Sequence, residues 1–423
     1  MNISPEFIAS VQSELIARLD LRRTDISGMH DEQLRGLAQR CIRDILATRG
    51  LPMGVEPQRV ERQLLQEAVG CGVLEDLLAD ESVTEIMVNG AGTVFVERAG
   101  RLSLAPLQFS SERALSRVIE RLLVATGRRV DEGSPMVDAR LADGSRINVV
   151  IPPLALNGPA ITIRKFGQRR LELADLLAFG ALSVDMARFL EVATLERRNV
   201  VVSGGTGSGK TTLLNVLSQL IPPGERVVTI EDSAELQLGH PNLVTLQARP
   251  SNLEGQGLVS IRDLVRNALR MRPDRIVVGE CRGGEALDML QAMNTGHNGS
   301  LTTAHANTPR DLLSRLEVMV LMAGMDLPVL AIREQIASAV NLIVQQARFA
   351  CGARRIVLIA EVTGMEGGRI QMQDLFRFER TGVNASGHTE GYFTGCGNLP
   401  VFLEPLQGTA QTMNPSCFDR RSA

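Results

Sequence analysis

The chain has 423 residues, a formal net charge of −3, 44% hydrophobic residues and 22% charged residues. This length suffices for two or three domains with substantial cores, and no apolar run is long enough to cross a bilayer. Aromatic residues make up only 3%, which argues against a single-strand nucleic-acid motor, because such a motor needs stacking rings and a basic groove. The N-terminus lacks the order of a secretory signal, so we expect a cytoplasmic protein.

The cysteines show no C-x-x-C spacing, so the sequence predicts neither a zinc ribbon nor a disulfide framework. We expect reduced thiols. The six cysteines are Cys41, Cys71, Cys281, Cys351, Cys396 and Cys417.

Residues 1–65 have the periodicity of helices and predict a small helical module. Apolar residues recur at helical spacing, as in Phe7, Val11 and Leu15, and Gly50-Leu51-Pro52 interrupts the pattern. The arginines of this module are interpreted as a solvated face, with docking of a partner as the alternative.

Residues 66–165 mix strands with helices and predict an α+β domain. Thr84 to Val88 reads as a strand that ends in the turn Asn89-Gly90, and Val94 to Glu97 reads as its hairpin partner. Ser110-Ser111 precedes apolar residues at helical spacing and predicts a capped helix to Leu123. Residues 166–183 follow as an interdomain linker, in which the polar run Gly167 to Arg170 leads into a short helix and Gly180, because the composition changes and no strand pattern spans them.

The stretch from Gly204 to Thr212 matches G-x-x-x-x-G-K-[ST] and lies between an apolar run, Val200 to Val202, and a helical pattern. Strand, glycine turn and helix start together predict a phosphate-binding loop. Lys210 is placed to reach the β- and γ-phosphates, and the Thr211 hydroxyl to bind Mg²⁺. The chain has only two lysines among its 45 basic residues, so a lysine at this offset is a specific signal. The predicted nucleotide-binding residues are Gly204, Gly205, Thr206, Gly207, Ser208, Gly209, Lys210, Thr211 and Thr212.

From residue 184 to about 405, apolar strands alternate with helices, which predicts a parallel α/β sheet with the phosphate loop after its first strand. Polar groups follow three further strands: Glu231 to Glu235, Glu280 to Arg282, and His305 to Asn307. Ligands of such sheets bind beyond the carboxyl ends of the strands, so we expect these groups to meet at one edge.

Phosphoryl transfer requires a bound metal ion, an attacking water molecule in the right orientation, and neutralisation of the charge on the transferring group. Glu280 is a candidate for holding Mg²⁺, directly or through water, and Glu235 for orienting or deprotonating the water. His305 and His297 are two of five histidines. A single histidine is more often structural than catalytic. The position of His305 directly after a strand favours a catalytic role for that residue.

These blocks resemble the secretion-superfamily ATPases, the P-loop motors of type II secretion, type IV pili and type IV secretion. Glu231-Asp232-Ser233-Ala234-Glu235 is similar to the family's Asp box, Gly279-Glu280-Cys281-Arg282 to its Walker B motif, and Thr295-Gly296-His297 through Asn307 to its His box. The resemblance covers residues 66 to about 400. It implies a RecA-like motor domain after an α+β N-domain, a catalytic role for Glu235, and Glu280 as the Walker B acid.

Three stretches resemble the Tad/Flp pilus (tight adherence) assembly ATPases in particular: Ser82 to Gly90, Ile151 to Leu156, and Ile163 to Phe166. The absence of a four-cysteine module departs from the typical type II motor, and a type IV secretion motor is the nearest alternative. Residues 406–423 match nothing in the family, and we expect a disordered tail.

The resemblance further implies that N-domain arginines reach the nucleotide phosphates, and by position these are Arg140, Arg146 and Arg164. It implies a hexameric ring that hydrolyses ATP with Mg²⁺ beneath the inner membrane and passes motion to a membrane platform protein. Pilus assembly is the expected outcome. The rival interpretations are a RecA-like nucleic-acid motor, which predicts ATPase activity stimulated by DNA or RNA, and a nucleotide sensor, which predicts no hydrolysis.

Overall fold

A computed structural model describes residues 5–21, 31–51, 56–167, 170–249, 251 and 256–421. The chain divides into two compact units, residues 1–168 and 169–423, each considered separately below. No helix among the described residues is both long and apolar enough to cross a membrane.

The first unit begins with a three-helix module made of α1 (Pro5–Leu21), α2 (Asp31–Arg49) and α3 (Pro57–Val69). Their apolar faces bury a small core around Val11, Ile42 and Leu64, which confirms the predicted helical periodicity.

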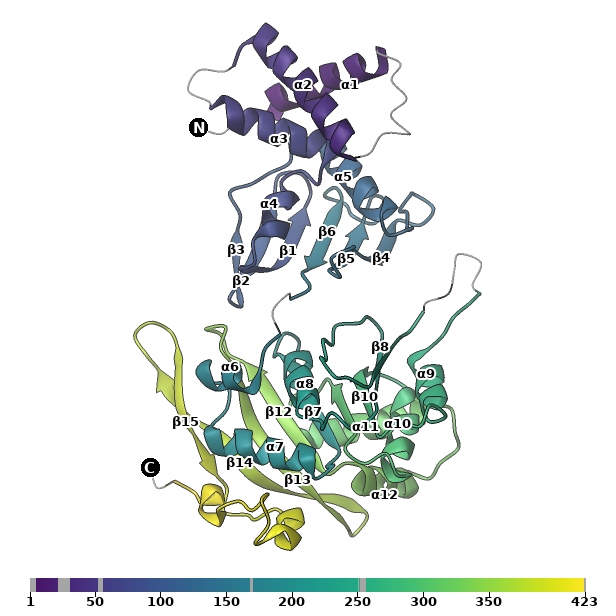
Figure 1. Ribbon diagram of the computed structural model, residues 1–423, viewed down its shortest axis with the longest axis vertical. Coiled ribbons are helices and arrows are strands. Elements are labelled where there is room, and N and C mark those ends of the chain that lie inside the picture. The colour runs from purple at the N-terminus through teal and green to yellow at the C-terminus, as the bar shows by residue number, and fades with distance from the viewer. Residues whose placement is uncertain are drawn as a thin grey trace. The chain divides into compact units, whose positions relative to one another are not determined.

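A six-stranded antiparallel sheet follows in the same unit (Figure 1), in the order β3-β2-β1-β6-β5-β4. One face packs on the helices α4 (Leu74–Ala79) and α5 (Glu112–Val124). The Ser111 hydroxyl accepts the N–H of Ala114 and caps α5, as predicted. The strands are β1 (Val83–Asn89), β2 (Val94–Arg98), β3 (Arg101–Leu104), β4 (Met136–Arg140), β5 (Arg146–Val150) and β6 (Ala160–Arg164).

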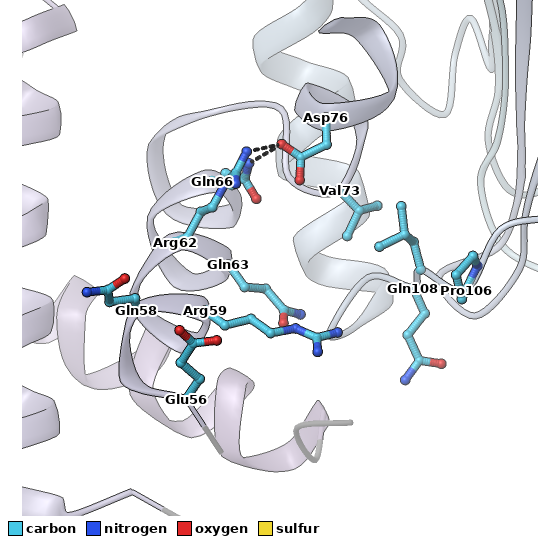
Figure 2. Close-up of a pocket in the computed structure, with 11 residues that line it drawn as sticks. Glu56, Gln58, Arg59, Arg62, Gln63, Gln66, Val73, Asp76, Pro106 and Gln108 are labelled. Atoms are coloured by element: carbon cyan, nitrogen blue, oxygen red, sulfur yellow. Dashed lines mark hydrogen bonds and ion pairs between the residues drawn. The ribbon is translucent and has the colours of Figure 1, made fainter. Parts of the chain in front are cut away.

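Arg121 of α5 fixes the helical module to this sheet domain. Its guanidinium donates to the carbonyls of Gly70 and Glu67, each at 2.8 Å, which are among the last free carbonyls of α3. Burial lowers the pKa of Arg121. Figure 2 shows a second link nearby, where Arg62 and Gln66 of α3 point to Asp76 of α4.

The second unit is a nine-stranded sheet with the order β15-β14-β13-β12-β7-β11-β10-β8-β9. The six strands from β12 to β9 are parallel, and β13 to β15 continue the sheet as antiparallel strands. The strands are β7 (Val200–Gly204), β8 (Val227–Glu231), β9 (Leu243–Gln247), β10 (Arg275–Cys281), β11 (Leu301–Ala304), β12 (Leu342–Arg348), β13 (Arg354–Glu366), β14 (Arg369–Val383) and β15 (Thr389–Gly395).

Helices cover both faces of this sheet (Figure 1), so its central strands are buried on both sides. This is the predicted α/β architecture. One face carries α6 (Leu173–Ala178), α7 (Val184–Leu195) and α8 (Lys210–Gln219). The other carries α9 (Ile261–Ala268), α10 (Glu285–Asn294), α11 (Pro309–Met322) and α12 (Val329–Ala339).

The expected linker over residues 166–183 contains the expected short helix, α6, and from residue 169 on this stretch belongs to the second unit. Leu176 and Leu182 are 5% and 2% exposed and belong to the core of the second unit. The apolar residues in this stretch form the amphipathic helix α6, which outweighs the polar start of the segment. Gln168 and Arg169, part of the expected polar run, lie outside the described residues.

The expected disordered tail is wrong as far as residue 421. Two short 3₁₀ helices, η2 (Val401–Leu406) and η3 (Pro415–Phe418), return the chain to the sheet. Phe418 is 1% exposed and packs on Phe376 and Phe189, with ring centroids 4.9 and 5.8 Å away. One buried ring anchors the segment, because burying a phenylalanine contributes about 1.5–3 kcal/mol.

Candidate functional site

The sequence from Gly204 to Thr212 forms a tight turn between β7 and α8. Gly207 and Gly209 have φ angles of 70° and 95°, a left-handed conformation that side chains other than glycine rarely adopt. Gly209 is the N-cap of α8, and Lys210, Thr211 and Thr212 form the first turn of that helix. Backbone N–H groups at such a helix start suit a phosphate.

Gly204 is required for a different reason, namely space. A Cβ at this position would lie 2.4 Å from the carbonyl oxygen of Gln346 and 2.6 Å from the Ser208 hydroxyl. The loop therefore packs tightly against β12, which runs parallel to β7.

Buried polar atoms at this loop have no hydrogen-bond partner in the part of the chain that the structure describes. They are the Ser208 hydroxyl and the side-chain oxygen of Gln346, whose residues are 1% and 3% exposed. Lys210 donates its Nζ to the carbonyl of Gly205 at 3.1 Å. Since buried polar groups are nearly always paired, these atoms fit a site that a polar ligand completes.

Glu231, at the end of β8, holds the loop that carries Glu235. Its Oε1 accepts hydrogen bonds from the backbone N–H groups of Glu235 at 2.8 Å and Leu236 at 3.0 Å. Glu231 is buried, with 2% of the residue exposed. Asn215 of α8 accepts the N–H of Gln237 at 3.1 Å. The Glu235 loop is thereby tied both to its own strand and to the helix that begins at the phosphate loop.

Glu280 lies near the end of β10 and pairs with Arg282. Nε and Nη2 of Arg282 both donate to Oε2 of Glu280, at 2.9 and 2.7 Å. This hydrogen bond is the main cause that raises the pKa of Arg282, and the charges of Glu280, Asp232 and Glu235 raise it further. Glu231, whose carboxylate holds the Glu235 loop, lies against Gly279, because a Cβ on Gly279 would be 3.0 Å from its Cγ. The Glu235 loop and the end of β10 that carries Glu280 are therefore neighbours, and the roles of the two glutamates stay predictions.

His305 follows β11 directly, at the same edge of the sheet. β11 pairs in parallel with β7, with Ala304 opposite Ser203. Gln345 of β12 donates to the carbonyls of Ala306 at 3.1 Å and Asn307 at 3.0 Å, which fixes the backbone after His305.

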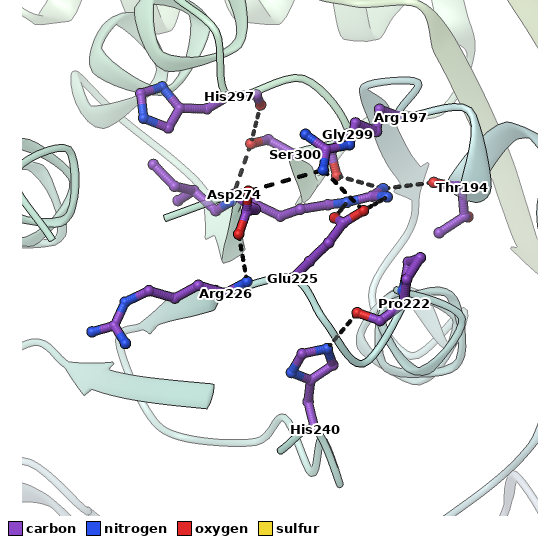
Figure 3. A network of polar contacts seen from close by, with 12 residues as sticks. Thr194, Arg197, Pro222, Glu225, Arg226, His240, Asp274, His297, Gly299 and Ser300 are labelled. Atoms are coloured by element: carbon purple, nitrogen blue, oxygen red, sulfur yellow. Dashed lines mark hydrogen bonds and ion pairs between the residues drawn. The ribbon is translucent and has the colours of Figure 1, made fainter. Parts of the chain in front are cut away.

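His297 does not join this group within the chain. It precedes β11, so it lies at the amino ends of the parallel strands, opposite the phosphate loop. Figure 3 shows it beside Ser300, whose hydroxyl donates to the His297 carbonyl at 2.7 Å. The four residues of β11 separate His297 from His305 and carry the chain across the sheet, and a catalytic role for His297 stays a prediction.

The three predicted arginines form one row in the first unit. Arg140 pairs with Arg146 across β4 and β5, and Arg146 pairs with Arg164 across β5 and β6. Arg164 lies 3.9 Å from Glu85, and Arg140 donates to the Gly144 carbonyl at 3.1 Å. That the arginines reach a nucleotide stays a prediction.

Sequence reasoning missed the residues that β12 and β13 bring to the loop. Arg354 donates its Nε to the Gly207 carbonyl at 2.9 Å, and Arg348 and Gln346 lie against the same glycines. The signal was present: the apolar run from Leu342 to Val344 is another parallel strand that ends in polar residues.

The pocket in Figure 2, of about 540 Å³, is unrelated to this chemistry. Its lining comes from residues 56–108 of the first unit and includes none of the predicted site residues. Among the described residues, no group of three or more His, Cys, Asp or Glu side chains is arranged to hold a metal. The Thr211 hydroxyl and the Glu280 carboxylate are hard oxygen donors, which fit Mg²⁺ when phosphates supply further ligands.

Comparison with known proteins identifies the family. The family described as "Type II/IV secretion system protein" matches residues 67–390. A putative conjugal transfer protein of Mycobacterium tuberculosis is 40% identical over 325 residues, 75% of this chain and 92% of that protein.

Two solved structures are similar. The VirB11 ATPase of the Brucella suis type IV secretion system is 33% identical, with 68% of this chain and 94% of that one covered and a TM-score of 0.38. The ATPase DotB of Yersinia pseudotuberculosis is 18% identical, with 73% and 80% covered and a TM-score of 0.50, a likeness of fold alone. The second unit has the predicted RecA-like fold, and the chain belongs to the family of type II/IV secretion system proteins.

Proposed function

We propose that this protein hydrolyses ATP with Mg²⁺ and uses the energy to drive a bacterial secretion or pilus machine. The observation that carries the proposal is a phosphate loop after β7 in a parallel sheet whose strands β8 and β10 lead into Glu235 and Glu280 at the same edge. A nucleotide-binding loop alone would support binding only. The two carboxylates add the means to hold a metal and to activate water.

In the proposed reaction, the N–H groups of residues 205–211 and Lys210 bind the β- and γ-phosphates. Thr211 and Glu280 would hold Mg²⁺, which neutralises charge on the transferring phosphoryl group. Both hydrogen bonds from Arg282 go to Oε2 of Glu280, so Arg282 orients the carboxylate without using Oε1. Glu235, fixed by Glu231, accepts the proton of the attacking water, and His305 contacts the terminal phosphate from the end of β11.

The N-domain row of Arg140, Arg146 and Arg164 would approach the same phosphates when the two units close on the nucleotide. Arginine fingers contribute about 10³- to 10⁵-fold in related phosphoryl transfers. Hydrolysis would then change the position of the N-domain against the motor domain.

Glu235→Gln tests this proposal. The amide keeps the size of the side chain but cannot accept the proton, so ATP hydrolysis should fall about 10²- to 10⁴-fold, while MgATP binding is retained. The measurement is phosphate release beside equilibrium binding of MgATP. Glu285→Gln is the matched control: Glu285 accepts the N–H groups of Arg282 and Gly283 at 2.6 and 2.8 Å, and an amide oxygen preserves both bonds. Wild-type turnover in the Glu235 variant would refute the assignment.

For the cellular role, we propose a homo-hexameric ring at the inner face of the cytoplasmic membrane that acts on an inner-membrane platform protein. The stretches Ser82 to Gly90, Ile151 to Leu156 and Ile163 to Phe166 favour assembly of a Tad/Flp-type pilus. The similarity to a conjugal transfer protein and to VirB11 favours a second candidate, a type IV secretion or conjugation motor.

A deletion strain complemented with wild-type or Glu235→Gln protein separates the two candidates. Loss of surface pili with unchanged DNA or protein transfer supports pilus assembly. The reverse result supports the secretion motor and rules out the pilus assignment.

A further inference from the structure

The hairpin of β12 and β13 runs alongside the phosphate loop. β12 is parallel to β7 with Gln346 opposite Gly204, so the end of β12 passes beside the loop that follows Gly204. Across the hairpin, Arg348 is directly opposite Arg354. Directly opposite residues leave the same face of a sheet, so the hairpin carries two guanidinium groups to one place.

Both arginines contact the two left-handed glycines of the loop. Arg354 donates its Nε to the Gly207 carbonyl at 2.9 Å. A Cβ on Gly207 would lie 2.9 Å from Nη1 of Arg348, and a Cβ on Gly209 would lie 3.3 Å from Cδ of Arg354. The arginines therefore form one wall of the loop.

The hydrogen bond from Arg354 has a chemical consequence for phosphate binding. A phosphate loop works because its N–H groups point inward, whereas an inward carbonyl oxygen would repel the phosphate. By accepting from Arg354, the Gly207 carbonyl is held toward β13 and away from the concave side of the turn.

The charge at this place also points to an anion. Two directly opposed arginines and Lys210 put three positive side chains beside one short turn, which suits a polyanionic ligand. Among the described residues, the buried Ser208 hydroxyl and Gln346 side-chain oxygen have no hydrogen-bond partner.

We propose that Arg348 and Arg354 complete the nucleotide site from within the same chain. Arg348 binds the phosphates directly, and Arg354 is a positioning residue that holds the Gly207 carbonyl. This inference rests on the proposed nucleotide-binding function and adds two residues to it.

The test is equilibrium binding to the full chain of a fluorescent MgADP analogue and its displacement by MgADP and by inorganic pyrophosphate. Pyrophosphate has no base or ribose, so it reports on the phosphate cradle alone. Arg348→Ala and Arg354→Ala should each weaken pyrophosphate binding about 10- to 100-fold, the effect of losing a charge-assisted hydrogen bond. Arg348→Lys keeps the charge and Arg354→Lys keeps a donor, so each should recover part of the loss.

Arg355→Ala is the matched control. Arg355 is the next residue on β13, its guanidinium lies 4.4 Å from the Phe378 ring centroid, and it donates to the Thr389 carbonyl at 3.0 Å. The variant removes the same charge from the other face of the sheet, so pyrophosphate affinity should stay within about twofold of wild type after screening by salt. Thermal melting of every variant identifies the temperature at which all are folded.

Pyrophosphate affinities of the Arg348 and Arg354 variants equal to that of Arg355→Ala would overturn the inference and leave the proposed function intact. Wild-type protein that binds neither MgADP nor pyrophosphate would instead overturn the proposed function itself.

Discussion

The two edges of the motor sheet both carry clustered charge, yet they differ in how that charge is satisfied. At the amino ends of the strands, Arg275 is fully buried and all three of its guanidinium nitrogens have protein partners. Nε and Nη2 donate to Glu225 at 2.5 and 3.3 Å, and Nη1 donates to the Thr194 carbonyl at 2.6 Å. Arg275 therefore needs no ligand to complete its hydrogen bonds, although at the same edge the buried Nδ1 of His297 has no partner among the described residues.

At the carboxyl ends, the cluster has partly exposed acids and buried polar atoms that have no hydrogen-bond partner among the described residues. Glu280 is 25% exposed on its side chain, and the Ser208 hydroxyl has no partner among the described residues. The difference teaches that clustered charge does not by itself mark a functional site. Buried polar atoms without a hydrogen-bond partner indicate a ligand site when they lie at the carboxyl edge of the strands, where ligands of such sheets bind.

Among the predictions that test this comparison, the largest expected difference in ATP hydrolysis is between variants of the two lysines. Lys210→Ala should lower ATP hydrolysis on the order of 10²- to 10³-fold, because a preorganised donor to the transferring group is lost. Lys165 is the matched control: its Nζ donates to the Asp80 carbonyl at 2.7 Å and the Leu77 carbonyl at 3.3 Å, within the first unit. Lys165→Ala should lower the melting temperature and leave turnover per folded molecule unchanged. Equal loss of turnover in both variants would contradict the assignment.

At the opposite edge we expect a loss of stability. Arg275→Met leaves Glu225 buried without its main partner and should lower the free energy of unfolding by about 3–5 kcal/mol, measured by urea denaturation. Arg197, which contacts the same Glu225 at 3.1 Å but has a side chain 45% exposed, is the control. Arg197→Met should cost less than about 1 kcal/mol. Nucleotide affinity of the folded Arg275 variant should be that of wild type, and a selective loss of affinity would break the comparison.

The smallest expected difference in turnover is between variants of the two histidines. His305→Ala should lower turnover about tenfold or more, because a hydrogen-bonding group at the phosphate edge is removed. His297→Ala should leave turnover near wild type. Steady-state ATP hydrolysis by the full-length protein measures both, and a larger loss for His297 would mean that the amino edge takes part in the reaction.

Sequence by itself determined the elements whose signals are local. The phosphate loop could be predicted because glycine, lysine and threonine occur at offsets that a strand, turn and helix start require. That Glu235 and Glu280 follow strands at one edge of the sheet could be predicted as well, because carboxyl ends of parallel strands share an edge whatever the details of packing.

Tertiary structure alone decided the features that depend on contacts between distant segments. Phe418 belongs to the core because Phe376 and Phe189 are there to receive it, and nothing near it in sequence shows this. Arg348 and Arg354 reach the phosphate loop because β12 pairs with β7 across more than 130 residues of chain. A side-chain pattern records which face of an element is apolar, but the neighbour of that face is set by the free energy of packing the whole domain.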